Sequence, residues 1–458
     1  MYNPDTIAAI ATPLGTGGVG IIRVSGPHAR DIARRIFQPA QKNCSWESHH
    51  LYHGDLLAAD GKTILDEVLI SLMHKPHSFT GEDVLEINCH GSPLIMQTIL
   101  AQLVEMGCRL AAPGEFTQRA FFNNRLDLAQ AEALAGIVAA RSEKSSAIAL
   151  AQLKGALSGE MENLRLLLIE ALALLEAAID FSEDVSAVET PPMPPQIDIV
   201  AERLQLLLNS YQTAKIYSEG INVVITGKPN VGKSSLLNTM TGRKRAIVTE
   251  IPGTTRDFLT DTINIRGIPV NIVDTAGIRK PQNDIEEQGI DLVWENLANA
   301  DIAIILLDGS KPLTKEDTDI IAKISKNNYL VAINKRDLPP AWDKAEIKKF
   351  LPDGKILNIS AKFQTGIDEL KNAILDSCFG KNEEYKGSVL ITNIRHKSAL
   401  EKAADNIQRA KESIISGMPP ECTVMDLREV LNSLDEITGK KINDEILDKI
   451  FSSFCIGK

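Results

Sequence analysis

A glycine-rich segment carries the strongest chemical signal in this chain. Residues 227–234 read Gly-Lys-Pro-Asn-Val-Gly-Lys-Ser; they follow an apolar run over 221–226 and precede a helix-like stretch. Backbone N–H groups at the start of a helix bind phosphate, Lys233 is spaced to reach the β- and γ-phosphates, and the Ser234 hydroxyl is spaced to ligate Mg²⁺. The segment therefore predicts a nucleoside triphosphate site whose contacts are Asn230, Val231, Gly232, Lys233, Ser234 and Ser235.

Two further polar segments predict which base is bound. Asp337 comes shortly after the apolar run 330–333, so its carboxylate should lie at the end of a strand. Its two oxygens can accept hydrogen bonds from guanine N1–H and the exocyclic amine, a donor pair that adenine lacks. Another polar segment follows the apolar run 356–359 and resembles the second guanine-contacting loop of GTPases. The predicted base contacts are Asn334, Lys335, Asp337, Ser360, Ala361 and Lys362.

A third segment concerns the γ-phosphate and the metal. Asp274 follows the apolar run 270–273 and begins Asp-Thr-Ala-Gly, which resembles the switch that contacts both groups in GTPases. Many GTPases next carry a Gln that orients the attacking water, but here Ile278 cannot do so. Either hydrolysis is slow, or a carboxylate or cation elsewhere in the chain takes the part of the Gln. Residues 283–289 include acidic candidates, although acidic residues in such a segment more often form a solvated face. The predicted contacts are Asp274, Thr275, Ala276 and Gly277.

Several segments together resemble one family. They are Asn230 within the phosphate loop, Gly-Thr-Thr-Arg-Asp at 253–257, the apolar residue after Asp-Thr-Ala-Gly, Phe-Thr-Gly-Glu-Asp at 79–83, and Cys-Ile-Gly-Lys at 455–458. The chain resembles the bacterial tRNA-modification GTPases called MnmE or TrmE, and the likeness extends over essentially its whole length. General GTPases have no reason to carry the segments outside 219–380.

The resemblance implies a mechanism that uses a monovalent cation. It places a K⁺ ion on Asn230 and on carbonyls of Thr249, Ile251 and Thr254, where a fixed cation can offset charge developing between the β- and γ-phosphates. It implies that Glu286, twelve positions after Asp274, orients water through a bridging solvent molecule. It also implies that Thr255 closes over the Mg²⁺ held by Ser234. The implied nucleotide contacts of this loop are Thr249, Glu250, Ile251, Pro252, Gly253, Thr254 and Thr255.

The N-terminal segment has two interpretations. Gly-Thr-Gly-Gly-Val-Gly at 15–20 matches a dinucleotide-binding pattern, but the residues after it predict a strand where that fold requires a helix. The resemblance instead implies a domain that dimerises and binds a 5-formyl- or methylene-tetrahydrofolate. The implied folate contacts are Arg23, Glu86, Arg125, which stands where Lys is usual, and Lys458; without the family they would be predicted to be surface charges.

Cys455 also has two interpretations. Its place four residues from the end matches a prenylation pattern only poorly, because Gly457 and Lys458 follow it. The resemblance places this thiol near the folate pocket and gives it a part in tRNA modification. A role as a nucleophile and a plain buried thiol both stay open, since no His partner is evident nearby in the sequence.

Composition predicts a multidomain enzyme of the reducing cytoplasm. The 458 residues are 44% hydrophobic and carry a net charge of −11, so RNA would be contacted through a local basic patch or a partner protein. The six cysteines lie far apart without paired spacing, which argues against a zinc site or a disulfide framework. Neither a signal peptide nor an apolar run of about 18 residues is evident, so no membrane segment is expected.

The order of strand-like and helix-like segments along the chain predicts three kinds of domain. Residues 1–118 alternate strand-like runs with turns and predict an α+β domain. Residues 119–218 form the first part of an all-α helical domain, and 381–458 form its second part. Between them, 219–380 predict an inserted α/β GTPase domain of the Ras-like class. We expect switch movements to pass to the helices at both insertion points.

The resemblance implies a function in tRNA modification. The chain would be a K⁺-activated, homodimeric GTPase that works with a flavoprotein resembling MnmG (GidA) in a heterotetramer. Together they would add a carboxymethylaminomethyl or aminomethyl-type group to C5 of the wobble uridine of certain tRNAs, using a tetrahydrofolate one-carbon unit. Two alternatives remain open: a ribosome-assembly GTPase of the Era or EngA type, and a non-enzymatic scaffold.

Overall fold

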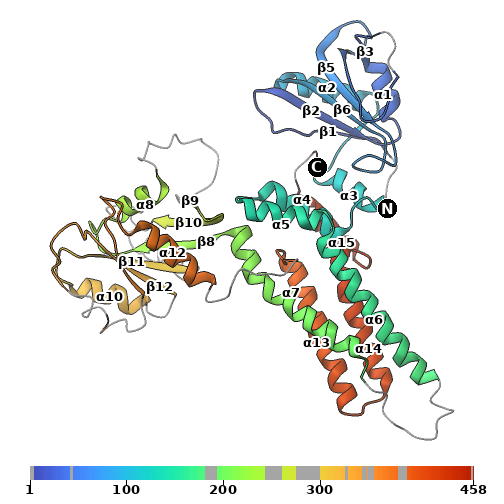
Figure 1. The fold of residues 1–458 in the computed structure, drawn as a ribbon. Coiled ribbons are helices and arrows are strands. Elements are labelled where there is room, and N and C mark those ends of the chain that lie inside the picture. Colours follow the sequence, from blue (N-terminus) through green and yellow to red (C-terminus); the bar gives the residue numbers. More distant parts are fainter. Residues whose placement is uncertain are drawn as a thin grey trace, which may run out of the picture. The chain divides into compact units, whose positions relative to one another are not determined.

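The protein forms two compact units. The computed structural model describes residues 5–41, 45–180, 193–242, 260–274, 300–324, 328–342, 348, 355–379, 389–454 and 457. One unit comprises Met1–Ala139, Ala149–Gln205 and Ile394–Lys458, and the other comprises Ala140–Ile148 and Leu206–Asn393. Figure 1 shows the elements of each.

The first unit contains a seven-stranded sheet. Its strand order is β3-β4-β5-β6-β2-β1-β7, in which only the pair β1 and β7 is parallel. Helices α1 (Ala29–Ile36) and α2 (Pro93–Glu105) pack against it in one buried apolar cluster. The strands are β1 (Ile7–Ile10), β2 (Gly17–Ser25), β3 (Phe37–Pro39), β4 (Leu51–Leu57), β5 (Ile64–Met73), β6 (Val84–Gly91) and β7 (Arg109–Leu110).

Helices make up the rest of the first unit. Apolar residues recur at spacings of three and four along α6 (Ala156–Asp180), and all are buried, as this periodicity predicts; they are Leu157, Met161, Leu164, Leu168, Leu172 and Leu175. Helix α14 (Pro420–Thr438) packs against both α6 and α13 (Ile394–Ile415). The remaining helices of this unit are α3 (Glu115–Phe122), α4 (Leu128–Ala139) and α15 (Asp444–Ser452), and their aromatic and leucine side chains form a second cluster.

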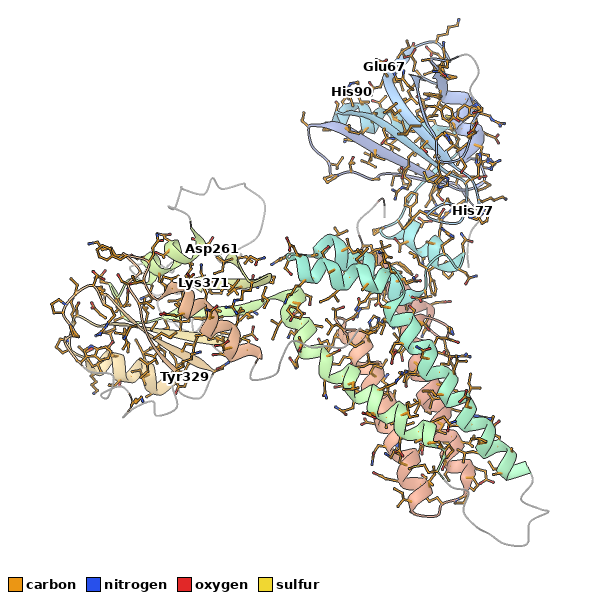
Figure 2. All side chains as sticks on the ribbon, in the orientation of Figure 1. Glu67, His77, His90, Asp261, Tyr329 and Lys371 are labelled. Atoms are coloured by element: carbon orange, nitrogen blue, oxygen red, sulfur yellow. The ribbon has the colours of Figure 1, made fainter. Side chains whose placement is uncertain are left out.

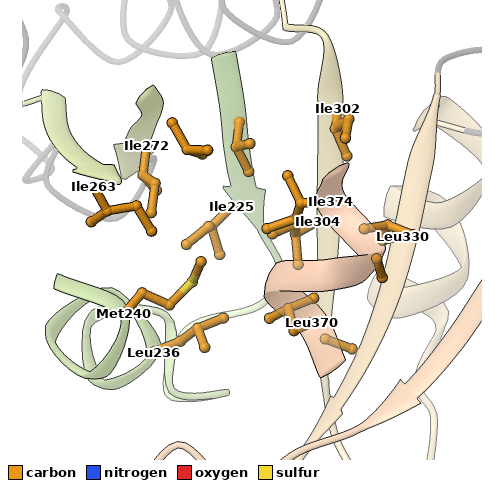
Figure 3. Packing of buried hydrophobic residues seen from close by; sticks show 14 of the residues in the cluster. Ile225, Leu236, Met240, Ile263, Ile272, Ile302, Ile304, Leu330, Leu370 and Ile374 are labelled. Carbon is orange, nitrogen blue, oxygen red and sulfur yellow. The ribbon is translucent and has the colours of Figure 1, made fainter. Parts of the chain in front are cut away.

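The second unit is built on a six-stranded sheet of order β13-β12-β11-β8-β10-β9, parallel except for β9. Alternate residues of its strands face two different cores; Ile225 and Ile304, for example, lie with Leu236 and Leu370 (Figure 3). The parallel strands are β8 (Ile221–Thr226), β10 (Ile268–Asp274), β11 (Ile302–Asp308), β12 (Tyr329–Asn334) and β13 (Lys355–Asn358), and the antiparallel strand is β9 (Thr260–Ile265). This unit also contains helices α8 (Lys233–Thr241), α10 (Lys315–Ile324) and α12 (Ile367–Phe379). The architecture is the α/β fold predicted from the apolar runs.

Two helices continue from one unit into the other. Helix α7 (Pro195–Glu219) leads into β8, while the first half of α5 (Glu143–Leu153) groups with the second unit. There Ile148 packs against the apolar core of the second unit, and the Lys144 ammonium lies 4.9 Å from the centre of the Tyr217 ring. Figure 2 shows the described side chains of both units, with Glu67 on β5 of the first and Tyr329 on β12 of the second.

The helices of the described part of the chain do not include a membrane span. Each is too short or too polar to cross a lipid bilayer.

Candidate functional site

The phosphate loop lies between β8 and α8 at the carboxyl edge of the parallel sheet, where ligands bind in open α/β folds. Gly232 adopts φ 102° and precedes the first residue of α8. A Cβ at this position would collide with the Asn334 side-chain amide, so only glycine lets the two loops approach this closely. The first backbone amides of a helix lack partners within the helix, so those at the start of α8 can bind phosphate.

Lys233 is already directed at the loop. Its side chain is buried, and its Nζ donates hydrogen bonds to the carbonyl oxygens of Gly227 at 2.6 Å and Lys228 at 2.8 Å. A triphosphate would compete with these carbonyls for the same ammonium group. The Lys233 ammonium group is therefore placed to move a short distance from these carbonyls to the β- and γ-phosphates.

Asn334 joins three loops that are far apart in the sequence. Its Nδ2 donates to the carbonyl of Val231 at 2.9 Å, and its Oδ1 accepts from the backbone N–H of Ala361 at 3.0 Å. The residue is 3% exposed, so both hydrogen bonds are protected from water. The phosphate loop and both predicted base-contacting loops are thereby fixed to one another.

Lys335 makes a second link to the phosphate loop. Its Nζ lies 3.0 Å from the carbonyl oxygen of Asn230 and 2.7 Å from Asp308 Oδ2. Burial opposes ionisation of Asp308, but hydrogen bonds from Lys335 and Ser310 outweigh it and hold the pKa of this carboxyl below its usual range. Asp308, at the end of β11, is a residue of the site that sequence reasoning missed.

Asp337 is exposed and oriented by one neighbour. The Ser360 hydroxyl donates to its Oδ1 at 2.7 Å, which orients the exposed carboxylate at the strand-end edge. Lys362 is also exposed, and its ammonium lies 5.2 Å from the centre of the Phe363 ring. This geometry suits a base that donates two adjacent hydrogen bonds.

The residues of the phosphate loop suit a metal ion that is held jointly by the protein and a bound nucleotide. Among the described residues, no group of three His, Cys, Asp or Glu side chains could hold a metal ion by itself. Ser234 and Asn230 are both exposed beside the loop, so their side-chain oxygens can serve as ligands. Asn230 also adopts φ 64°, a left-handed conformation that asparagine tolerates well.

Part of the predicted switch machinery lies outside the described residues. It comprises Thr249, Glu250, Ile251, Pro252, Gly253, Thr254, Thr255, Thr275, Ala276, Gly277, Ile278 and Glu286. Of Asp274 only the backbone is described, and it ends β10.

The N-terminal sheet brings two of the predicted folate contacts together. Arg23 on β2 pairs with Glu86 on β6, with its Nη2 2.7 Å from Glu86 Oε1. The Arg23 guanidinium also lies 5.8 Å and 5.7 Å from the ring centres of Phe79 and Phe116. Its Nη1 donates to the carbonyl of Gly457 at 3.2 Å, so the C-terminal segment reaches this site.

Arg125 lies close to the same motif. Its Nε donates to the carbonyl of Ser78 at 3.1 Å, next to the Phe79 that flanks Arg23. Arg125 also lines a cavity of about 390 Å³ with Asn124 and Lys440. Lys458 and Cys455 lie outside the described residues, although Gly457 between them is described.

A buried ionic cluster supports this edge of the sheet. Arg119 is 3% exposed and pairs with Asp5, Glu82 and Glu115. Burial opposes ionisation of Glu115, but hydrogen bonds from Arg109 and the Ala112 N–H lower its pKa. The cluster joins Glu82 of the Phe-Thr-Gly-Glu-Asp segment to Arg119 and Glu115 of α3.

The fold and the site define a GTPase of the phosphate-loop class, and comparisons with known proteins identify its family. The family model described as MnmE helical domain matches residues 128–455, and that described as GTP-binding protein TrmE N-terminus matches residues 6–125. The tRNA modification GTPase MnmE of Syntrophus aciditrophicus is 47% identical over 454 residues, covering 99% of each chain. The protein of the same name from Acetivibrio thermocellus is 41% identical over 459 residues, covering 100% of each. The chain belongs to the MnmE family of tRNA modification GTPases and is a GTP hydrolase.

A solved structure of Era from Aquifex aeolicus, bound to GDP and AlF4⁻, resembles part of the chain. It is 28% identical, covers 41% of this chain and 66% of its own, and superposes with a TM-score of 0.30. The low score leaves the full-length relatives as the basis for the family assignment.

Proposed function

We propose that this GTPase works with a flavoprotein resembling MnmG (GidA) to modify C5 of the wobble uridine of certain tRNAs. The group added is of the carboxymethylaminomethyl or aminomethyl type, and its one-carbon unit comes from a tetrahydrofolate. The observation that carries this proposal is the similarity, over essentially the full length, to proteins named as tRNA modification GTPases. Hydrolysis supplies movement between domains and none of the carbon chemistry.

Nucleotide binding rests on the loops joined by Asn334. Asp337 reads guanine, Lys233 exchanges the carbonyls of Gly227 and Lys228 for phosphate oxygens, and the amides at the start of α8 bind the remaining phosphate charge. Ser234, Thr255 and Asp274 would hold Mg²⁺, which would supply positive charge for the β- and γ-phosphates.

The proposed catalytic apparatus replaces the missing Gln. Ile278 cannot orient water, so Glu286 takes that part. The exposed Asn230 side chain and the carbonyls of Thr249, Ile251 and Thr254 hold K⁺. The cation supplies positive charge where an arginine finger would otherwise act.

The folate proposal rests on the geometry around Arg23. The Arg23–Glu86 pair is partly exposed and offers a donor and an acceptor for polar groups of a pterin, and the half-buried Phe79 beside it offers a flat surface for the ring. The hydrogen bond from Arg23 to Gly457 supports a part for the neighbouring Lys458 and Cys455 in folate binding. Arg125 completes the contacts.

The assembly we propose is a homodimer formed through residues 1–118, joined by the flavoprotein in a heterotetramer. In this arrangement 219–380 is a GTPase domain inserted between the helical segments 119–218 and 381–458. The tRNA is contacted largely through the partner, because the chain itself carries a net charge of −11.

Reconstitution tests the proposal. The purified chain, the flavoprotein, an unmodified tRNA transcript, methylene-tetrahydrofolate and an amine donor, ammonium or glycine, should yield a modified wobble uridine only with GTP and K⁺. Glu286→Ala should bind GTP and lose most turnover and product. Product formed equally with Na⁺, or with a non-hydrolysable GTP analogue, would refute the proposed coupling.

A further inference from the structure

Lys228, the second residue of the phosphate loop, has a partner on a neighbouring helix. Its Nζ lies 2.5 Å from Asp317 Oδ2 and 2.8 Å from the Thr314 hydroxyl. The Lys228 side chain is 18% exposed and that of Asp317 is 4% exposed. Because both charges are largely shielded from solvent, salt screens their attraction less than it would screen a surface pair.

Asp317 is itself firmly placed. It lies in the first turn of α10, where its Oδ2 accepts hydrogen bonds from the backbone N–H of Thr314 at 2.8 Å and from its hydroxyl at 3.1 Å. A carboxylate in the first turn is also stabilised by the helix dipole. Lys228 is therefore joined to a rigid element.

Lys228 also takes part in the phosphate loop through its backbone. The carbonyl of Lys228 accepts the hydrogen bond from Lys233, the lysine directed at the phosphates. The second half of the loop is held from the other side, where Lys335 and Asn334 donate to the carbonyls of Asn230 and Val231. Lys228 and Asp317 thus hold the first half of the phosphate loop, and Asn334 and Lys335 hold the second half.

We propose that Lys228 and Asp317 are positioning residues, an ion pair that holds the first half of the phosphate loop in the shape that receives the triphosphate. A loop ordered before binding spares the ligand the entropic cost of ordering it, so the pair acts on nucleotide affinity. The hydrolytic step itself is untouched. The inference needs only GTP binding and is independent of the proposed tRNA chemistry.

A double-mutant cycle tests the pair in the full-length chain, with fluorescent GTP to measure Kd and phosphate release to measure kcat. Lys228→Met keeps the apolar stem, and Asp317→Asn keeps acceptors for the Thr314 cap. Each should raise the Kd about tenfold, and the double variant should also raise it about tenfold, because the two act through one contact. The kcat at saturating GTP should stay within about twofold, and Lys228→Arg should restore the affinity to within about twofold.

The matched control is Lys315→Met, which removes an exposed lysine from the same turn of α10 and should leave the Kd unchanged. A Kd that is unchanged in Lys228→Met would overturn the proposal. So would a weakened Kd in Lys228→Met with normal binding by Asp317→Asn, since that pattern means that the lysine touches phosphate directly. Additive effects in the double variant would show that the two residues act separately and would also overturn it.

Discussion

Replacing Glu132 with glutamine should destabilise the first unit by about 3 kcal/mol. Glu132 on α4 accepts hydrogen bonds from Nε and Nη2 of Arg395 at 3.0 and 2.6 Å, and from Nε2 of His396 at 2.7 Å. Its side chain is 11% exposed, and Arg395 also donates to the last carbonyls of α14. Loss of the carboxylate leaves a buried guanidinium without its counter-charge.

The magnitude follows from the pKa of Glu132. Burial opposes ionisation, but the hydrogen bonds from His396 and Arg395 outweigh it and lower the pKa from 4.5 to about 2. At 1.36 kcal/mol for each pH unit, that difference corresponds to about 3 kcal/mol at neutral pH. Since the pKa is lower in the folded state, this stability is present above the unfolded value and is lost as the pH falls toward 2.

Urea denaturation followed by circular dichroism at pH 7 and pH 3.5 measures both effects. The difference in free energy of unfolding between wild type and Glu132→Gln should shrink by about 1.4 kcal/mol at the lower pH, because Glu132 is then largely protonated in the unfolded chain. The other carboxylates titrate equally in both proteins and cancel in the difference. Glu401→Gln on α13 is the matched control; its pair with Lys397 is 2.8 Å long but exposed, so it should cost less than about 0.5 kcal/mol. A loss below about 1 kcal/mol at pH 7, or an equal loss at both pH values, would refute this reasoning.

Three further outcomes are expected. Asn334→Ala leaves the partners of its two buried hydrogen bonds unpaired, so it should lower stability by about 1 to 3 kcal/mol and weaken GTP binding about tenfold in a titration. Asp337→Asn should bind GTP about 100-fold more weakly and favour xanthosine triphosphate; an unchanged preference would argue against the base assignment. Burial raises the pKa of Cys89 and Cys108 to about 11, so exposed Cys422 should be alkylated before these two thiols at pH 8, as peptide mass analysis can show.

The second sheet could be predicted because its strands are local features. Each of β8, β10 and β12 is a short apolar run followed by polar residues, and these strand ends meet at one edge of a parallel sheet. The identity of Asp337 as a base reader likewise depends on a short motif. Such patterns need no knowledge of distant contacts.

The side chains that hold the loops together could not be predicted in this way. Asn334 links the phosphate loop to Ala361 across 103 and 27 residues of sequence, and no periodicity marks such a contact. The partners of Asp308 and Arg119 could not be predicted for the same reason, because a charge in a sequence shows its partner only after folding. The first half of α5 has the texture of any short helix, so nothing in it revealed that it packs with the second unit.

The most direct test of the account is nucleoside mass analysis of bulk tRNA from cells that lack this gene. The C5-aminomethyl-type wobble uridines should disappear and should return with the wild-type chain. They should not return with Asp337→Asn or Glu286→Ala, because the account ties modification to GTP binding and hydrolysis at this site. An unchanged nucleoside profile would leave the GTPase in place and contradict the tRNA function, and full rescue by both variants would contradict the role of hydrolysis.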